Sequence, residues 1–192
     1  ANPYSDITCL EAINLIGRNI VQAVNDPSEE NYDALMFAGM LAGIGFGNAG
    51  CHLPHGMSYA VAGLVKDYQP QGWPADHPMV PHGISVIVNS PAVFRKTGPA
   101  CPERHWEAAD AMGADLTGKN MEDGGEILAD QIISMMRDTG IPNGLSGVGY
   151  SMSDLDALTD RSFAQKRLID NGPLPVARNE LKELFHDAMS YW

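Results

Sequence analysis

The stretch GIGFGNAGCHLPHG, Gly43 to Gly56, decides between two fold classes. Its first half holds Gly45-x-Gly47-x-x-Gly50, which is the glycine spacing of a dinucleotide-binding loop. Its second half brings one cysteine and two histidines into five residues, which is typical of metal sites. A dinucleotide loop needs a strand before it and a parallel sheet around it. The segments that flank this stretch therefore determine which half carries function.

The flanking segments follow a helical period rather than alternating strands and helices. The one strand-like run, Ile84 to Val88, cannot be assigned by periodicity alone. We therefore predict that the glycine motif is not a nucleotide site. The glycines are expected to recur on one helical face, where they let another helix or a ligand approach closely; they are Gly39, Gly43, Gly45 and Gly47.

Capping signals divide the chain into about seven expected helices with at most one strand. Ser5 is expected to cap the first helix, and Asp26-Pro27 to begin the second. The uncharged segment from Ala34 to Cys51 is too rich in glycine for a membrane span, so we expect a buried helix there. Ser151 and Asp154 have capping-box spacing. These signals predict an all-α domain over residues 1–192.

Charge and cysteine content exclude several classes of function. The chain has 24 acidic and 12 basic residues, a net charge of -12 that disfavours nucleic acid and anionic membrane surfaces. Its 3 cysteines are widely spaced, which argues against a disulfide framework and favours a reducing compartment. No signal peptide is recognisable, so we expect a cytoplasmic protein, or a mitochondrial matrix protein in a eukaryote. The chain begins without Met, and we expect it to be a fragment of a longer protein.

Two histidines share one local motif. They lie in Pro54-His55-Gly56 and Pro81-His82-Gly83, each near the start of an apolar segment. Two neutral imidazoles suit Fe(II) or Zn(II), but at least one more ligand, with a carboxylate among the candidates, must come from elsewhere. A compact zinc knuckle at Cys51 is less favoured, because no second cysteine pair closes a tetrahedral site.

These residues carry a resemblance. GIGFGNAGCHLPHGMSYAVAG followed by DHPMVPHGISVIVNSPAVF resembles the iron-containing (group III) alcohol dehydrogenases, and most of all their hydroxyacid-oxoacid transhydrogenase branch. The likeness extends over essentially the whole chain. It implies an all-helical bundle of the dehydroquinate synthase-like C-terminal type. In this family that domain follows a nucleotide-binding α/β domain, which is absent from this chain.

The resemblance implies four metal ligands. An aspartate and a histidine four residues apart on one helix are followed by two more histidines, and His55 and His82 match these last two. No acidic residue lies four positions before any of the six histidines, so the first pair of ligands is missing from this chain.

Three further residues acquire expected roles from the resemblance. Tyr59 stands where many members have a histidine credited with proton transfer or substrate contact; its hydroxyl can serve that catalytic role, or its ring can simply be packed between helices. Lys66 and His77 are the candidates for binding a substrate carboxylate, with a solvated loop edge as the alternative. No residue is assigned to nucleotide binding.

The implied function belongs to the intact protein. It is reversible hydride transfer by a metal-dependent oxidoreductase that uses NAD or NADP, acting on an alcohol, a hydroxyacid or an oxoacid. We expect the fragment to be inactive alone and to expose an apolar, glycine-rich surface toward its missing N-terminal domain, and we expect a homo-oligomer. The hypothesis from another class is a self-contained helical interaction or scaffold domain without catalysis. A reading frame that extends upstream by a nucleotide-binding domain would separate the two.

Overall fold

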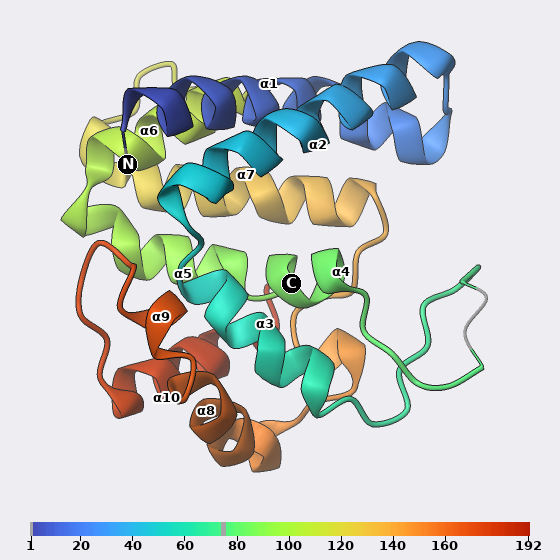
Figure 1. Cartoon of the computed structure of the whole chain (residues 1–192), viewed down its shortest axis with the longest axis vertical. Coiled ribbons are helices and arrows are strands. Elements are labelled where there is room, and N and C mark those ends of the chain that lie inside the picture. Colours follow the sequence, from blue (N-terminus) through green and yellow to red (C-terminus); the bar gives the residue numbers. More distant parts are fainter. Residues whose placement is uncertain (1, 74–75) are drawn as a thin grey trace. The chain divides into compact units, whose positions relative to one another are not determined.

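The prediction of an all-α fold is confirmed. The computed structural model describes residues 2–73 and 76–192, and these residues form helices, turns and loops with no strand (Figure 1). The run from Ile84 to Val88 belongs to a helix and its C-cap in spite of its β-branched side chains. Ser85 and Val88 are fully buried there, so packing outweighs the weak local preference for a strand.

The described residues form ten α-helices and four short 3₁₀ helices. The first three helices are α1 (Pro3–Asn25), α2 (Glu29–Ala49) and α3 (Leu53–Gly63). The middle of the chain forms α4 (His82–Ile87), α5 (Ser90–Thr97), η1 (Gly98–Ala100), α6 (Pro102–Ala111), η2 (Met121–Asp123) and α7 (Gly124–Asp138). The remaining elements are η3 (Ser146–Val148), η4 (Met152–Asp154), α8 (Leu155–Phe163), α9 (Lys166–Ile169) and α10 (Arg178–Asp187). The expected loop after α3 is observed, apart from positions 74 and 75, which lie outside the described residues.

The first two helices begin at residues other than those expected. Asn2, not Ser5, is the N-cap of α1: its side chain accepts the N–H groups of Tyr4 and Ser5. Ser5 instead completes a capping box from the third helical position. The second helix is capped by Ser28 rather than by Asp26, which ends α1. Asparagine, serine and aspartate all rank among the best N-cap residues, so residue type alone does not decide which of them caps a helix. The N-cap is the residue at which the backbone changes from extended to helical.

The helices fall into two compact units. The first comprises Ala1–Gly50 and Gly98–Gly140, and the second comprises Cys51–Thr97 and Ile141–Trp192. In the first unit α1 lies along α2, and α6 packs against both α1 and α7 (Figure 1). Leu128, Ile132 and Met136 of α7 are almost fully buried. This unit is held together by apolar packing along these long helices.

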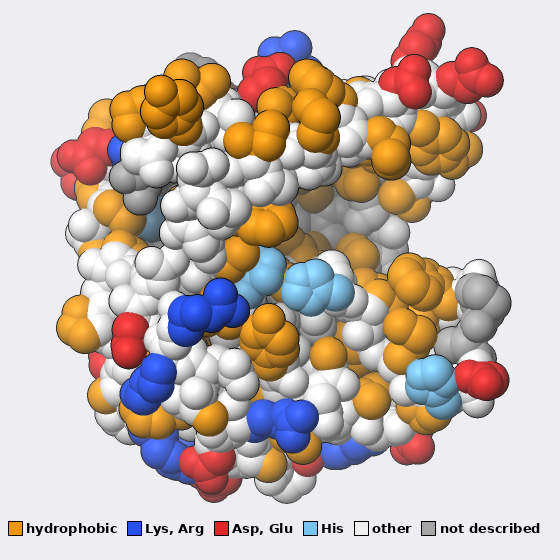
Figure 2. All heavy atoms as spheres, viewed as in Figure 1, with side chains coloured by type: hydrophobic (Ala, Val, Ile, Leu, Met, Phe, Trp, Pro, Cys, Tyr) orange, Lys and Arg blue, Asp and Glu red, His pale blue; other side chains and the backbone are white. Residues whose placement is uncertain are grey.

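The uncharged segment from Ala34 to Cys51, most of which lies in α2, is not the buried helix that we predicted. Met36 is 76% exposed, and the other large apolar side chains of the outer surface of α2 are about half exposed: Tyr32, Phe37, Met40, Ile44 and Phe46. Figure 2 shows apolar side chains gathered over α1 and α2. Large contiguous apolar patches are uncommon on monomeric soluble proteins, where they mark interaction sites, ligand-binding grooves or aggregation-prone surfaces. These apolar side chains are thus not buried among the described residues.

The four glycines of α2 do not share one face. A Cβ at Gly45 would lie 2.3 Å from the Cys9 side chain of α1, so this glycine does permit close helix packing. The same atom built at Gly39, Gly43 or Gly47 would meet nothing within 4 Å. The dinucleotide motif is thus part of a helix: Gly45 and Gly47 lie in α2, and Gly50, with φ of 75°, ends it. No strand precedes it among the described residues, which excludes a nucleotide loop.

In the second unit α3 lies at the centre. It contacts α4, α5, α8 and α9, and α8 in turn packs on α10. Leu53, Met57 and Val61 of α3 are fully buried, as expected for a helix that is apolar nearly all round. The side chains predicted to align along α10 are buried as well; they are Leu181, Leu184, Phe185 and Met189. Ser151 and Asp154 form the expected capping box before α8.

Within the described part of the chain, no single helix combines the length and hydropathy needed to cross a membrane, although the successive helices α2 and α3 pass such a test as a pair.

Candidate metal centre

The first histidine of the repeated motif lies in the first turn of α3. Gly50 turns the chain with its positive φ, and Pro54 occupies one of the first helical positions, where its missing N–H costs no hydrogen bond. The backbone N–H of His55 donates to the carbonyl of His52 over 3.0 Å. A Cβ at Gly56 would lie 2.8 Å from the terminal carbon of the Ile169 side chain, so a larger residue beside this histidine would require that side chain to shift.

The second histidine begins α4. Pro81, with φ of −53°, is the N-cap, and His82 is the first helical residue. The Ser85 N–H donates to the Pro81 carbonyl over 2.9 Å and closes the first turn. Proline has φ fixed near the value of a helix entrance, so it sets the direction in which α4 leaves the loop. The side chain of His82 is exposed.

The fold brings these two histidines together. Their ring centroids are 5.3 Å apart and the ring planes are inclined at 58°. With about 2.0–2.1 Å between zinc and each nitrogen in tetrahedral geometry, the centroids of two imidazoles on one ion would lie roughly 5 Å apart. The observed separation thus fits two ligands of one divalent ion. His55 and His82 lie near the starts of separate helices, as predicted, and a long loop joins these two helices.

The local electrostatics favour the neutral form of His55. Burial of its half-buried ring lowers the pKa of this imidazole, and repulsion from His82 lowers that pKa further. A neutral imidazole keeps one nitrogen lone pair free to accept a metal ion. The lowered pKa of His55 is therefore compatible with a role as a metal ligand at neutral pH.

The pair does not form a complete metal site within this chain. Among the residues that the structure describes, no three His, Cys, Asp or Glu side chains form a cluster fit to hold an ion. Catalytic zinc sites have three protein ligands and keep a position open for substrate. His55 and His82 are thus candidates for two ligands of a set that would need others.

Tyr59 follows His55 by one helical turn. Residues four apart lie on the same face of a helix, so its ring projects on the side of α3 that carries His55. The side chain is 47% exposed, which disagrees with the alternative that it is packed between helices in this chain. Tyr59 is thus exposed on the same helix as the histidine.

The two candidates for substrate binding each have a nearby carboxylate. Lys66 Nζ lies 2.6 Å from Asp154 Oδ2 and 5.7 Å from the centre of the Tyr150 ring. The hydrogen bond from Lys66 lowers the pKa of Asp154. His77 Nδ1 lies 2.6 Å from Asp76 on an exposed loop. These contacts favour a structural role for Lys66 and leave His77 at a solvated loop edge.

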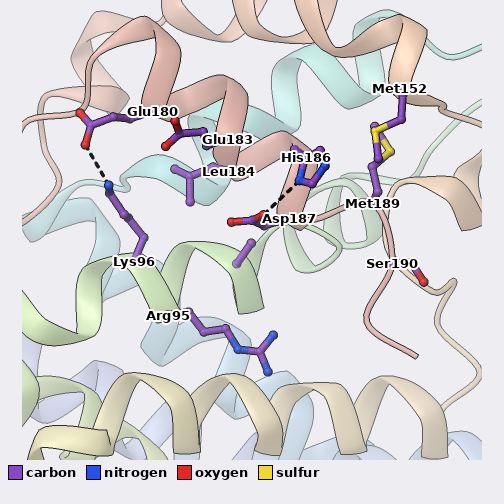
Figure 3. Close-up of a pocket in the computed structure, with 11 residues that line it drawn as sticks. Arg95, Lys96, Met152, Glu180, Glu183, Leu184, His186, Asp187, Met189 and Ser190 are labelled. Atoms are coloured by element: carbon purple, nitrogen blue, oxygen red, sulfur yellow. Dashed lines mark hydrogen bonds and ion pairs between the residues drawn. The ribbon is translucent and has the colours of Figure 1, made fainter.

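The second unit also contains a pocket of about 560 Å³. Figure 3 shows Lys96 paired with Glu180, and His186 with Asp187, along its walls. Acidic and basic side chains are mixed there and already pair with one another, and neither His55 nor His82 lines the pocket. It has no connection with the candidate metal ligands.

Sequence reasoning missed two serines beside the histidines. The hydroxyl of Ser58 donates to the backbone oxygen of His55 over 2.8 Å, and that of Ser85 donates to the backbone oxygen of His82 over 2.7 Å. The signal was available, because the repeated motif extends to Pro-His-Gly-x-Ser at both places.

Comparison with known proteins gives consistent matches. Residues 1–189 match the family model described as Fe-containing alcohol dehydrogenase family, C-terminal. The chain is 42% identical over 193 residues to the mitochondrial hydroxyacid-oxoacid transhydrogenase of Xenopus laevis, covering 100% of this chain and 42% of that protein. The corresponding protein of Homo sapiens is 41% identical, with 100% and 41% covered. The chain thus spans less than half the length of these relatives.

Solved structures agree in fold. A 1,3-propanediol oxidoreductase superposes with a TM-score of 0.85 at 28% identity, covering 98% of this chain and 46% of that one. An alcohol dehydrogenase from Oenococcus oeni gives a TM-score of 0.83 at 25% identity, covering 97% and 45%. A sulfoacetaldehyde reductase from Bifidobacterium kashiwanohense, solved with NAD+, shares the fold at 20% identity and a TM-score of 0.77, with 98% and 44% covered.

Proposed function

This chain belongs to the iron-containing alcohol dehydrogenase family, and from that premise we propose that it is the metal-binding C-terminal part of an oxidoreductase acting on alcohols, hydroxyacids or oxoacids. The observation that carries the proposal is the pair formed by His55 and His82, whose rings approach to 5.3 Å from the starts of two helices. A hydroxyacid-oxoacid transhydrogenase is the favoured variant, because relatives that are 42% identical carry that name.

The residues fit a divalent ion, Fe(II) or Zn(II), as two of its ligands. When bound, such an ion supplies Lewis acidity toward the substrate oxygen, and NAD or NADP supplies the hydride acceptor. The ring centroids of His55 and His82 lie 5.3 Å apart, close enough for both imidazoles to serve one ion. Tyr59 is exposed on the same helix as His55, where its hydroxyl is proposed to exchange a proton with substrate.

The remaining ligands and the nucleotide site are proposed to lie in a preceding part of the protein, an N-terminal nucleotide-binding domain. The exposed apolar side chains of α2, beside glycines with open space around them, support a surface that such a domain covers. On this proposal the 192-residue chain alone has no dehydrogenase activity, and its uncovered surface promotes self-association. A carboxylate-bearing substrate would need a cation, a role proposed for His77 and, if its pair with Asp154 opens, for Lys66. The relatives named above are mitochondrial, which supports the mitochondrial matrix as the compartment.

The test uses the full-length protein with either histidine replaced. We expect His55→Ala and His82→Ala each to lose the metal and the activity, since loss of a ligand exceeds the roughly 10–100-fold cost of losing a group that only orients one. The measurement is metal content per chain by elemental analysis after dialysis, followed by assays with alcohols, hydroxyacids and oxoacids.

The matched control is His186→Ala, because His186 is an exposed histidine on α10 that pairs with its neighbour Asp187 and lies outside the proposed site. This variant should keep both metal and activity. Stoichiometric metal in the His55→Ala, His82→Ala double variant would refute the proposed site.

A further inference from the structure

Each histidine of the pair has a serine three residues later whose hydroxyl binds the histidine's own backbone oxygen. The bonds are 2.8 Å from Ser58 to His55 and 2.7 Å from Ser85 to His82. Two segments far apart in the chain thus repeat not only a sequence motif but also its hydrogen bond. The repetition coincides with the two residues that the fold brings together.

Neither serine is available to a substrate. Ser58 is 1% exposed and Ser85 is fully buried. A buried hydroxyl that loses its acceptor pays a desolvation penalty, so both bonds are expected to persist in the folded protein. Whatever these serines contribute must therefore act through the backbone.

The backbone oxygen concerned belongs to the peptide group that joins each histidine to a glycine. Glycine has more conformational freedom than any other residue, so a His–Gly peptide is a weak point in the first turn of a helix. The N-caps of both helices, His52 for α3 and Pro81 for α4, make no side-chain capping bond. At both places the serine hydroxyl donates to the carbonyl oxygen of the peptide group that follows the histidine Cα, and so adds a contact next to the Cα–Cβ bond.

The glycines that follow the two histidines have different surroundings. At Gly56 a Cβ would lie 2.8 Å from the terminal carbon of the Ile169 side chain, whereas at Gly83 it would meet nothing within 4 Å. Packing thus restricts only the first position. The serine bond is common to both, which indicates that it serves the histidine rather than the glycine.

We propose that Ser58 and Ser85 are positioning residues that hold the imidazoles of His55 and His82 in the orientation needed to share one divalent ion. The inference rests on the proposed metal site. It predicts that each hydroxyl raises metal affinity without touching the metal or the substrate.

The experiment compares Ser58→Ala, Ser85→Ala and the double variant with the unaltered full-length protein. Affinity for Zn(II) is measured by competition with a chelator, and Co(II) is substituted to record the visible absorption of the bound ion. We expect each single variant to bind Zn(II) about tenfold more weakly, at the lower end of the range for groups that orient metal ligands. The Co(II) absorption should change in position or intensity, because ligand orientation changes.

The matched control is Ser90→Ala. Ser90 is likewise buried at 3% exposure in the same unit, and its hydroxyl donates over 3.1 Å to a backbone oxygen, that of Val86, which is not a histidine. Unfolding midpoints of the metal-free proteins should fall similarly in all three single variants. Zn(II) affinity and the Co(II) spectrum should change only in Ser58→Ala and Ser85→Ala.

The histidine variants separate the two proposals. If His55→Ala and His82→Ala keep their metal, the metal site itself is wrong. If they lose it while Ser58→Ala and Ser85→Ala bind Zn(II) as tightly as Ser90→Ala does, the site stands and the positioning role is overturned. The single variants are tested separately, so failure of the double variant to fold does not affect the comparison.

Discussion

At the scale of single residues, a repeated motif predicts more than an isolated one. The tripeptide Pro-His-Gly occurs twice, and this repetition identifies His55 and His82, whose ring centroids lie 5.3 Å apart in the structure. Nothing similar marks the partner of Lys66, because Asp154 lies 88 positions away in the sequence. A repeated sequence motif can be recognised because its residues are close together in the chain, whereas an ion pair between distant segments leaves no motif. The two serines are part of the repeated motif, but the sequence does not show that their hydroxyls bind the histidine carbonyls.

The ion pair between Lys66 and Asp154 makes a prediction at this scale. Lys66→Gln and Asp154→Asn should each lower the free energy of unfolding slightly, and the double variant should lose less than the sum of the two. Since the Lys66 side chain is 43% exposed and screened by solvent, we expect a coupling of about 0.2–1 kcal/mol. The measurement is a double-mutant cycle by urea unfolding.

The pair of Lys182 with Asp156 offers a more exposed comparison, with side chains 40% and 66% exposed. Its cycle should show weaker coupling than that of Lys66 and Asp154. If Lys66→Gln instead leaves stability unchanged and raises KM for a hydroxyacid in the full-length protein, Lys66 binds substrate after all.

At the scale of elements, helical periodicity predicted where helices occur better than it predicted whether they are buried or exposed. The expected helices are present, and the run of β-branched residues at α4 is helical as the family resemblance implied. The observed N-caps of α1 and α2 differ from the predicted ones by three and two residues, because several good capping residues lie close together in each place. The exposure of α2 was mispredicted for a different reason. The segment from Ala34 to Cys51 carries no charge, but a lack of charge does not show that a helix is buried within its own chain.

Two glycines allow an element-scale prediction about helix packing. A Cβ at Gly17 of α1 would lie 2.6 Å from the backbone oxygen of Met112, which follows α6, so Gly17→Ala must push these segments apart. We expect a loss of roughly 1–3 kcal/mol, as for other overpacked sites. Gly39→Ala on α2 meets no atom within 4 Å and should stabilise the helix by about 0.5–1 kcal/mol. Urea unfolding of the two variants measures both, and a shared sign would contradict this account.

At the scale of the whole molecule, one buried histidine makes stability depend on pH. His105 is 7% exposed, and burial lowers its pKa from the usual 6.5, opposed by its hydrogen bond to the backbone of Cys101. Because the unfolded chain then binds a proton more readily than the folded one, stability should be highest above pH 6.5 and fall as the pH drops below it. His105→Gln should flatten this dependence. Urea unfolding at pH 7.5 and 5.5 tests it, and an equal loss in both proteins would assign the effect to other groups.

The connection between α3 and α4 has a consequence for how an ion would be captured. This loop is held by a bond of 2.8 Å from the Met79 N–H to the Tyr68 oxygen, and it returns His82 to within 5.3 Å of His55. Bringing the ends of a flexible segment together costs conformational entropy. Where two ligands lie apart before binding, this cost lowers the net affinity for the metal ion. Here the folded chain already holds the two histidines near each other. If the two imidazoles bind one ion, as proposed, loop closure does not reduce the affinity that they contribute.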